Sequence, residues 1–288
     1  MKRRTFIGAS AGASVGLLTG TAQAMKTTLL STLELKGNIQ HSACYWCYGS
    51  IPLETFLQDL NGLGVKAIDL TGPKEWPLLK KYDIHAAMCW GAGMGIEKGW
   101  NDTKLHEELV ADYLQLIPKV AAAGYTNLIC FSGNRNGMDD DEGLQNCVKG
   151  LKQLLPTAEK HGVVLQMELL NSKVDHNDYM CDRSRWGVAL CKALGSENFK
   201  LLYDIYHMQI MEGDVIRTIQ DFHPYFGHYH TGGNPGRHEI NDTQELNYPA
   251  IMKAILDTGY KGHVAQEFIP TYEDKIAALK EGITICDV

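Results

Sequence analysis

The sequence predicts a single (β/α)8 barrel, and three observations support this fold. Short apolar, β-branched runs alternate with longer amphipathic runs, which is the pattern of βαβ units around a parallel sheet. Eight such strand candidates follow one another in residues 25–288, a length typical of the closed barrel. No long polar linker interrupts the alternation, so we expect one catalytic domain over residues 25–288.

Each strand candidate is a run of mainly apolar residues. The eight runs are Ile39–Tyr45, Val65–Leu70, Ile84–Trp90, Thr126–Phe131, Val163–Leu169, Phe199–Asp204, Phe226–Thr231 and His263–Phe268. The helix candidates between them are Leu53–Leu63, Lys104–Ala123, Glu142–His161, Ser184–Leu194, Asp214–Phe222, Tyr248–Thr258 and Tyr272–Glu281. Glycines at 124, 162 and 259 come just before a strand and are expected to end helices.

An open, doubly wound sheet is the alternative fold. Such a sheet normally carries a glycine-rich phosphate-binding turn after its first strand. The corresponding segment here, Cys44-Tyr-Trp-Cys-Tyr48, contains no glycine, which favours the barrel.

The N-terminus is expected to be an export signal over residues 1–24. A basic start with Arg3 and Arg4 precedes an apolar run rich in small residues, and Ala22-Gln-Ala24 offers a small-x-small cleavage site. The paired arginines resemble a twin-arginine signal and predict a periplasmic protein. An ordinary secretory signal is the alternative, and a stable membrane anchor is not expected because the apolar run is short.

Charge and cysteine content limit the partners. The formal net charge is −7, and loss of residues 1–24 would lower it to −10 because Lys2, Arg3 and Arg4 would be removed with no acid. An acidic protein repels polyanions, so we expect no nucleic-acid partner. The eight cysteines contain one CxxC pair, Cys44 and Cys47, without the second pair of a structural zinc site. Disulfide content and assembly state stay open, and a homo-oligomer is compatible with the sequence.

Four polar residues end the last four predicted strands. They are Glu168, Asp204, His230 and Glu267, separated by 36, 26 and 37 residues, each about one βα unit. Catalytic groups of an α/β barrel lie at the carboxyl ends of its strands, and neighbouring strands are about 4.8 Å apart. We therefore expect the four side chains to converge.

Three carboxylates so close together would repel one another unless a cation neutralised them. Oxygen ligands with one imidazole suit a hard or borderline divalent ion. The expected cofactor is one divalent cation, Mn2+, Mg2+ or Co2+, with Zn2+ also compatible, held by Glu168, Asp204, His230 and Glu267.

Further candidates surround this predicted site. His207 lies three residues beyond Asp204, and Arg237 lies in the glycine-rich loop after His230, where a guanidinium could bind carboxylate or hydroxyl oxygens. Trp46 and Trp90, at the ends of early strands, could either line the pocket or pack in the core. His228 shares the strand face of His230, so it is expected in the barrel interior.

Several segments together resemble the xylose isomerase-like barrel superfamily, and within it the hydroxypyruvate isomerase branch. They are Gln166-Met-Glu-Leu-Leu-Asn171, Asp204-Ile-Tyr-His-Met-Gln209, His228-Tyr-His-Thr-Gly-Gly-Asn-Pro-Gly-Arg-His-Glu239, Glu245-Leu-Asn-Tyr-Pro-Ala250 and Gln266-Glu-Phe268. The resemblance implies metal binding by the four residues above, with Glu168 and Glu267 as an acid/base pair that moves a proton through an enediolate. It also implies substrate contacts from His207 and Arg237. His230 departs from the branch, which more often carries Gln there.

The sequence thus predicts an isomerase or epimerase of a small keto acid or free sugar. An exported lyase or hydrolase of keto-sugars or keto-glycosides, with the same metal site, is the alternative. A catalytically silent sugar-binding barrel is disfavoured because binding alone does not need a second carboxylate base. A repair endonuclease is disfavoured because the chain is acidic.

Overall fold

The computed structural model describes residues 33–288. The expected export signal at residues 1–24 lies outside the described residues, as does the start of the predicted catalytic domain.

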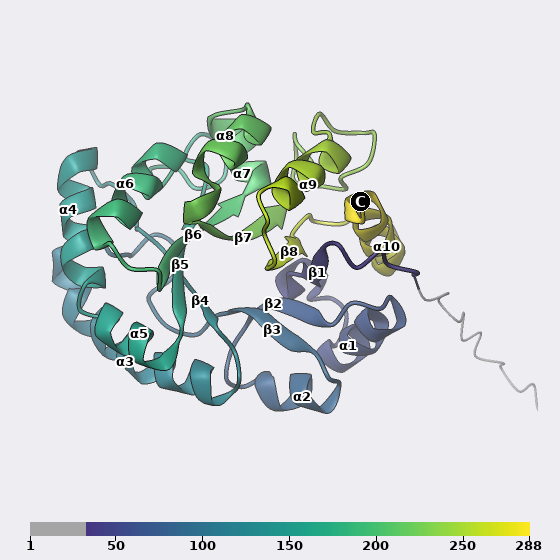
Figure 1. Ribbon diagram of the computed structural model, residues 1–288, viewed down its shortest axis with the longest axis horizontal. Coiled ribbons are helices and arrows are strands. Elements are labelled where there is room, and N and C mark those ends of the chain that lie inside the picture. Colours follow the sequence, from purple (N-terminus) through teal and green to yellow (C-terminus); the bar gives the residue numbers. More distant parts are fainter. Residues whose placement is uncertain (1–32) are drawn as a thin grey trace, which may run out of the picture. The chain divides into compact units, whose positions relative to one another are not determined.

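Eight parallel strands form a nearly closed barrel (Figure 1). The strands are β1 (Gln40–Ala43), β2 (Ala67–Thr71), β3 (His85–Cys89), β4 (Asn127–Cys130), β5 (Val164–Leu169), β6 (Phe199–Asp204), β7 (Phe226–Thr231) and β8 (His263–Gln266). They pair in the order β1-β8-β7-β6-β5-β4-β3-β2, and the remaining gap between β1 and β2 is bridged at Cys44 and Asp69. This confirms the (β/α)8 barrel.

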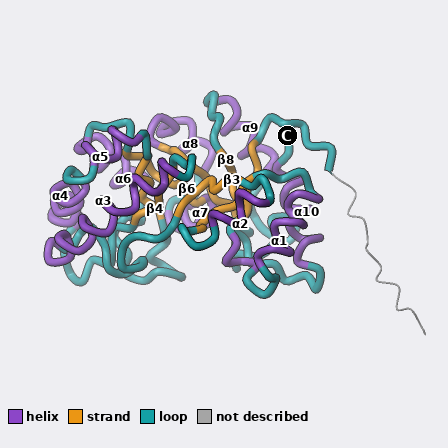
Figure 2. Tube along the Cα trace, turned by 90° about the horizontal axis from the view of Figure 1, so that it is seen from below, coloured by secondary structure: helices purple, strands orange, loops and turns teal. Residues whose placement is uncertain are grey.

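Helices surround the strands, which lie at the centre in Figures 1 and 2. The α-helices are α1 (Leu53–Gly62), α2 (Trp76–Lys81), α3 (His106–Ala122), α4 (Asp140–Leu151), α5 (Leu155–His161), α6 (Ser184–Leu194), α7 (Ile205–Met211), α8 (Val215–Phe222), α9 (Tyr248–Asp257) and α10 (Lys275–Cys286). Three short 3-10 helices, at Tyr45–Tyr48, Thr103–Leu105 and His223–Tyr225, fill the connections. No helix among residues 33–288 is both long and apolar enough to cross a membrane.

Glycines end helices where the sequence predicted. Gly162, after α5, has φ = +65°, and its N–H bonds back to the carbonyl of Glu159. Gly124 and Gly259, after α3 and α9, also have positive φ values of +86° and +80°. This left-handed conformation is easily reached only without a Cβ, so each glycine lets the chain turn back into the next strand.

One predicted helix was wrong, because the structure has two helices in its place. Residues Glu142–His161 were expected to form one helix, but they belong to two helices, α4 and α5, separated at residues 152–154. Pro156 is at the start of α5, where a missing N–H is tolerated, whereas inside a continuous helix it would remove a hydrogen bond. The short helices α2 and α7 were not predicted, because six or seven residues show too little periodicity.

Candidate active site

The four predicted ligands meet at the carboxyl ends of their strands. Glu168 is the last residue but one of β5, and Asp204 is the last residue of β6. His230 lies in β7, and Glu267 directly follows β8. Each offers one atom within 4.8 Å of those of the other three. All four are buried, with exposed fractions of 0–4%. The structure therefore confirms that these four side chains converge.

Glu267 is the most heavily bonded of the carboxylates. Its Oε1 accepts a 2.7 Å hydrogen bond from the indole Nε1 of Trp46. Its Oε2 accepts from Nη2 of Arg237 at 2.7 Å and lies 2.7 Å from Nδ1 of His230. Burial would raise the pKa of Glu267, but His230 and Arg237 hold that pKa well below its usual range.

Asp204 faces both the cluster and a helix. Its Oδ1 accepts from the backbone N–H of His207 at 3.1 Å and so caps the start of α7. Its Oδ2 accepts from Arg237 Nη2 at 3.3 Å. Burial raises the pKa of Asp204 well above its usual value, with Arg237 opposing and the neighbouring Glu267 and Glu168 adding to the rise.

Glu168 has an uncompensated oxygen. Its Oε1 is 3.4 Å from Nδ1 of His230, yet it makes no hydrogen bond and is inaccessible to solvent. Burial raises the pKa of Glu168, and the nearby Glu267 adds to this effect while His230 opposes it. A buried carboxylate oxygen without a donor is costly unless a cation is its partner.

These observations fit a divalent cation. Three buried carboxylates face one arginine and one imidazole, so acids outnumber the permanent cation in the cluster. The oxygen-rich donor set with one ring nitrogen matches the ligands of hard and borderline ions. Residues Glu168, Asp204, His230 and Glu267 are therefore a candidate metal centre.

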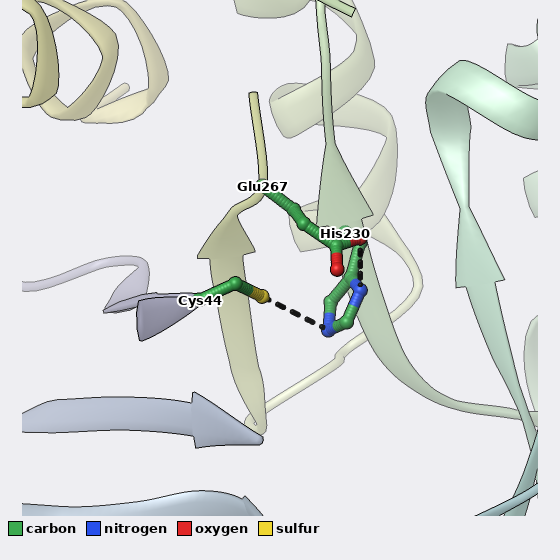
Figure 3. Close-up of side chains that lie close together, drawn as sticks. All are labelled: Cys44, His230 and Glu267. Atoms are coloured by element: carbon green, nitrogen blue, oxygen red, sulfur yellow. Dashed lines mark hydrogen bonds and ion pairs between the residues drawn. The ribbon is translucent and has the colours of Figure 1, made fainter. Parts of the chain in front are cut away.

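Asp69 orients the His230 ring through Nε2, the ring nitrogen that points away from Glu267. Its Nε2 lies 3.1 Å from Oδ2 of Asp69, and Nε2 of His228 lies 2.5 Å from the same oxygen. Figure 3 shows the ring between the Cys44 thiol, 3.8 Å from Nε2, and the Glu267 carboxylate on the Nδ1 side. Asp69, His228 and His230 are all fully buried. Because Nδ1 also faces the Glu267 carboxylate, both ring nitrogens carry a proton here: burial lowers the pKa of His230, but its acidic neighbours, Glu267 and Asp69 among them, raise that pKa well above its usual value. A metal ion would displace the Nδ1 proton, while an Nε2–H that donates to Asp69 would keep the ring oriented.

Sequence reasoning placed His228 in the barrel interior, and the structure confirms it. It missed Asp69, although one acid inside the otherwise apolar stretch Val65–Leu70 was a usable signal.

Arg237 lies in the loop that follows β7, as predicted. Its guanidinium carbon is 5.2 Å from the Trp46 ring centre and 5.4 Å from that of Tyr206. The loop folds back so closely on itself that a Cβ at Gly233 would stand 2.2 Å from the carbonyl oxygen of Glu239, so only glycine fits there. Two aromatic faces and two carboxylates thus fix the guanidinium over the cluster.

His207 is fully buried beside Asp204. Its Nδ1 is 2.6 Å from Nδ2 of Asn171, and its Nε2 is 3.6 Å from Oδ2 of Asp204 and has no hydrogen-bond partner. It is not among the residues that line the pocket described next, so its contact with substrate stays a prediction.

A pocket of about 400 Å3 opens onto the cluster. Its polar side is formed by Glu168, His176, Arg237 and Glu267, and Trp46 and Trp90 form part of its apolar side. His176 belongs to the segment Asn171–Asp178, which follows β5.

The eight cysteines are all buried free thiols.

Comparison with known proteins agrees with this architecture. Residues 76–285 match the sequence model of the xylose isomerase-like TIM barrel family, so the chain belongs to that family. Among its relatives, the hydroxypyruvate isomerase of Escherichia coli is 30% identical over 183 residues, 63% of this chain and 69% of that protein. The 2-oxo-tetronate isomerase of Cupriavidus necator is 37% identical over 113 residues, 39% of this chain. That match spans only 43% of the Cupriavidus protein, less than half of its length.

Solved structures share the fold at lower identity. A crystal structure titled AP endonuclease, family 2, from Brucella melitensis superimposes with a TM-score of 0.76 over 84% of this chain and 96% of that one. Its sequence identity is 22%, so the likeness concerns the fold alone.

Proposed function

We propose that this protein is a metal-dependent isomerase or epimerase of a small sugar or keto acid, working by proton transfer through an enediolate. The observation that carries the proposal is the convergence of Glu168, Asp204, His230 and Glu267 at one end of the barrel. The names of the matched relatives, hydroxypyruvate isomerase and 2-oxo-tetronate isomerase, support the reaction class.

The chemistry requires a base next to a carbonyl and a way to stabilise the developing oxyanion. A bound divalent ion, Mn2+, Mg2+, Co2+ or Zn2+, would supply Lewis-acid stabilisation of that oxyanion. Glu168 and Glu267 come from strands β5 and β8 on either side of the cluster, and in this mechanism one removes the proton and the other returns one.

Other residues orient the reactants in this proposal. Arg237 donates to substrate oxygens from the pocket wall, and His207 fixes the substrate from beside Asp204. Trp46, which donates to Glu267 Oε1, holds that carboxylate at a fixed angle.

Proton exchange with solvent tests the function directly. The purified protein, loaded with Mn2+, would be incubated in D2O with hydroxypyruvate or common ketoses and followed by NMR. We expect deuterium to enter at a carbon next to the carbonyl while the carbon skeleton stays intact. A Mn2+-loaded protein that exchanges no such proton in any of these compounds would contradict the proposal.

A lyase or hydrolase acting on keto-sugars or keto-glycosides is the second candidate. It uses the same carboxylates, and the 400 Å3 pocket favours it by offering room for a glycoside. Release of an aglycone from a 3-keto-glucoside in the same NMR experiment would distinguish it from an isomerase.

We also propose that residues 1–24 direct export to the periplasm by the twin-arginine route. The support is the Arg3-Arg4 pair, the apolar run and the Ala22-Gln-Ala24 site. In cell fractionation, the wild type should appear in the periplasm with residues 1–24 removed, whereas a variant with both Arg3→Lys and Arg4→Lys should remain in the cytoplasm.

A further inference from the structure

His176 lines the pocket, yet the proposed chemistry at carbon does not use it. Among the described residues that line this pocket, Glu168, Glu267 and His176 have side chains that can both accept and release a proton, whereas Arg237 stays protonated. The two glutamates are proposed to act on the carbon-bound proton. His176 is therefore the remaining proton carrier that a bound substrate can reach.

Hydrogen bonds fix the segment that carries His176. The backbone N–H of His176 donates to the carbonyl of Asn171 at 3.1 Å, and its carbonyl accepts from the N–H of Tyr179 at 3.0 Å. The side-chain Oδ1 of Asn171 accepts from the N–H groups of Val174 and Asp175 at 3.0 and 2.9 Å. A turn closed by an asparagine side chain in this way holds the backbone of His176 in one position.

The His176 ring is packed against a neighbour but keeps its nitrogens free. Its centre lies 5.2 Å from that of the His207 ring, which is fully buried. Within residues 33–288, neither ring nitrogen of His176 has a hydrogen-bond partner. Burial and the positive charge of Arg237 lower the pKa of His176, so the ring is neutral at pH 7 and can take up a proton.

An isomerase must move a proton that an epimerase leaves in place. When a carbonyl migrates to the neighbouring carbon, the hydroxyl oxygen on that carbon loses its proton and the former carbonyl oxygen gains one. Inversion of a carbon leaves the carbonyl where it was, so no proton has to pass between oxygens. Carbonyl migration therefore requires a proton carrier in addition to the groups that act at carbon.

We propose that His176 is the catalytic residue that carries this proton between the two substrate oxygens, so that the protein is an isomerase and not an epimerase. The proposal rests on the proposed function for its chemistry at carbon. It adds a third proton-transfer residue to Glu168 and Glu267.

The transfer returns His176 to its starting state. Removal of the C–H proton turns the electron pair of that bond into the C=C bond of the enediolate and places the carbonyl pair on oxygen. A neutral ring nitrogen of His176 accepts the proton of the neighbouring hydroxyl and gives it to the former carbonyl oxygen. The new C=O bond forms as the C=C pair accepts a proton at the second carbon, so no oxidant or reductant is needed.

The test separates proton exchange at carbon from migration of the carbonyl. Mn2+-loaded wild type and His176→Gln would be incubated in D2O with the compound that the wild type exchanges fastest, hydroxypyruvate or a ketose. NMR would follow deuterium in the starting compound and the appearance of its aldehyde isomer. We expect His176→Gln to form the aldehyde about 100-fold more slowly with little change in KM, because an amide binds oxygens but carries no proton between them. Deuterium should still enter the starting compound at nearly the wild-type rate, because the enediolate forms and returns.

Controls separate this role from a structural one. His176→Phe keeps a ring that packs on His207 and should lose carbonyl migration as His176→Gln does. His223→Gln, at an exposed position outside the pocket, should keep both rates. Calorimetric titration should give His176→Gln the Mn2+ affinity of the wild type, since His176 is not among the four proposed ligands.

The outcomes distinguish the role of His176 from the proposed function. An equal loss of exchange and migration in His176→Gln, a loss of neither, or a weaker Mn2+ affinity would overturn the role of His176 alone. A wild type that exchanges the proton but forms no aldehyde isomer would also overturn it and would leave the protein an epimerase. A wild type that exchanges no proton would contradict the proposed function, and the role of His176 with it.

Discussion

The two halves of the barrel contribute different chemistry to the same opening. At the carboxyl ends of strands β5 to β8 lie Glu168, Asp204, His230 and Glu267, which are buried, ionisable and placed with one atom of each within 4.8 Å of the others. Strands β1 to β4 lead instead into Trp46, Leu70, Trp90 and Phe131, which line the apolar side of the pocket. One half therefore provides reactive groups and the other provides shape. Two residues connect the halves: Asp69 lies in β2 but contacts the imidazoles of β7, and Trp46 follows β1 but donates to Glu267.

The largest effect should come from removing the cation that the β5–β8 half is proposed to hold. Chelation with EDTA should lower the rate of deuterium exchange by at least about 1000-fold, because the oxyanion loses several kcal/mol of stabilisation. Mn2+ should restore the rate. The melting temperature should also rise with Mn2+, since three carboxylates would no longer repel one another. A metal-free protein with full exchange activity would contradict the proposal that the β5–β8 half acts through a bound cation.

Next in size are the two proposed acid/base residues. Glu168→Gln and Glu267→Gln should each lower kcat by about 1000-fold, because an amide cannot accept the proton. The matched control is Glu212→Gln, whose carboxylate accepts hydrogen bonds from Ser184 away from the pocket. That variant should lose some stability and keep its kcat. An equal loss of kcat in all three would point to general destabilisation.

A smaller effect is expected at Asp69, which links the two halves. Asp69→Asn should weaken Mn2+ binding by about 10- to 100-fold, because the amide no longer fixes the Nε2–H form of His230. Calorimetric titration with Mn2+ measures this affinity, and nitrogen chemical shifts of the Zn2+-loaded protein report whether Nε2 of His230 carries its proton. Asp287→Asn is the control, since Asp287 lies 3.5 Å from His41 and contacts none of the proposed ligands. Unchanged affinity in Asp69→Asn would limit its role to packing.

The smallest effect concerns the opposite ends of the strands. Burial, with a contribution from His228, lowers the pKa of His263 to about 4. The unfolded value is about 6.5, so the neutral ring stabilises the fold fully above pH 6.5, and this contribution is lost as the pH falls toward 4. We expect the free energy of unfolding to fall by about 2 kcal/mol over this window.

Urea unfolding at pH 7, 5 and 4 measures this dependence. His263→Gln should flatten it, while His223→Gln, at an exposed position, should not. An identical pH dependence in wild type and His263→Gln would show that other groups cause the acid sensitivity.

The carboxylate half was readable from the sequence and the apolar half much less so. The bounds of β6 and β7 agree with the prediction, because an apolar run ending in Asp204 or leading through His230 marks both the strand and its functional end. Leu70 gave no such signal because β2 is irregular there, with a register shift between Asp69 and Thr71 and φ = +61° at Leu70, so strand alternation does not tell where its side chain points. Ile96 lies in a loop, which has no periodicity to show the direction of a side chain. Asp69 pairs with residues 159 and 161 positions away, a contact that only the closed barrel creates.

The two oxygens of Asp204 serve different functions, which limits the residues that can replace it. One oxygen caps α7 and the other faces the proposed metal centre. Asn would preserve the helix cap but remove the negative charge, and Glu would preserve the charge but is a poorer cap. Aspartate alone meets both demands, so drift at this position would cost either the fold of the following segment or the reaction.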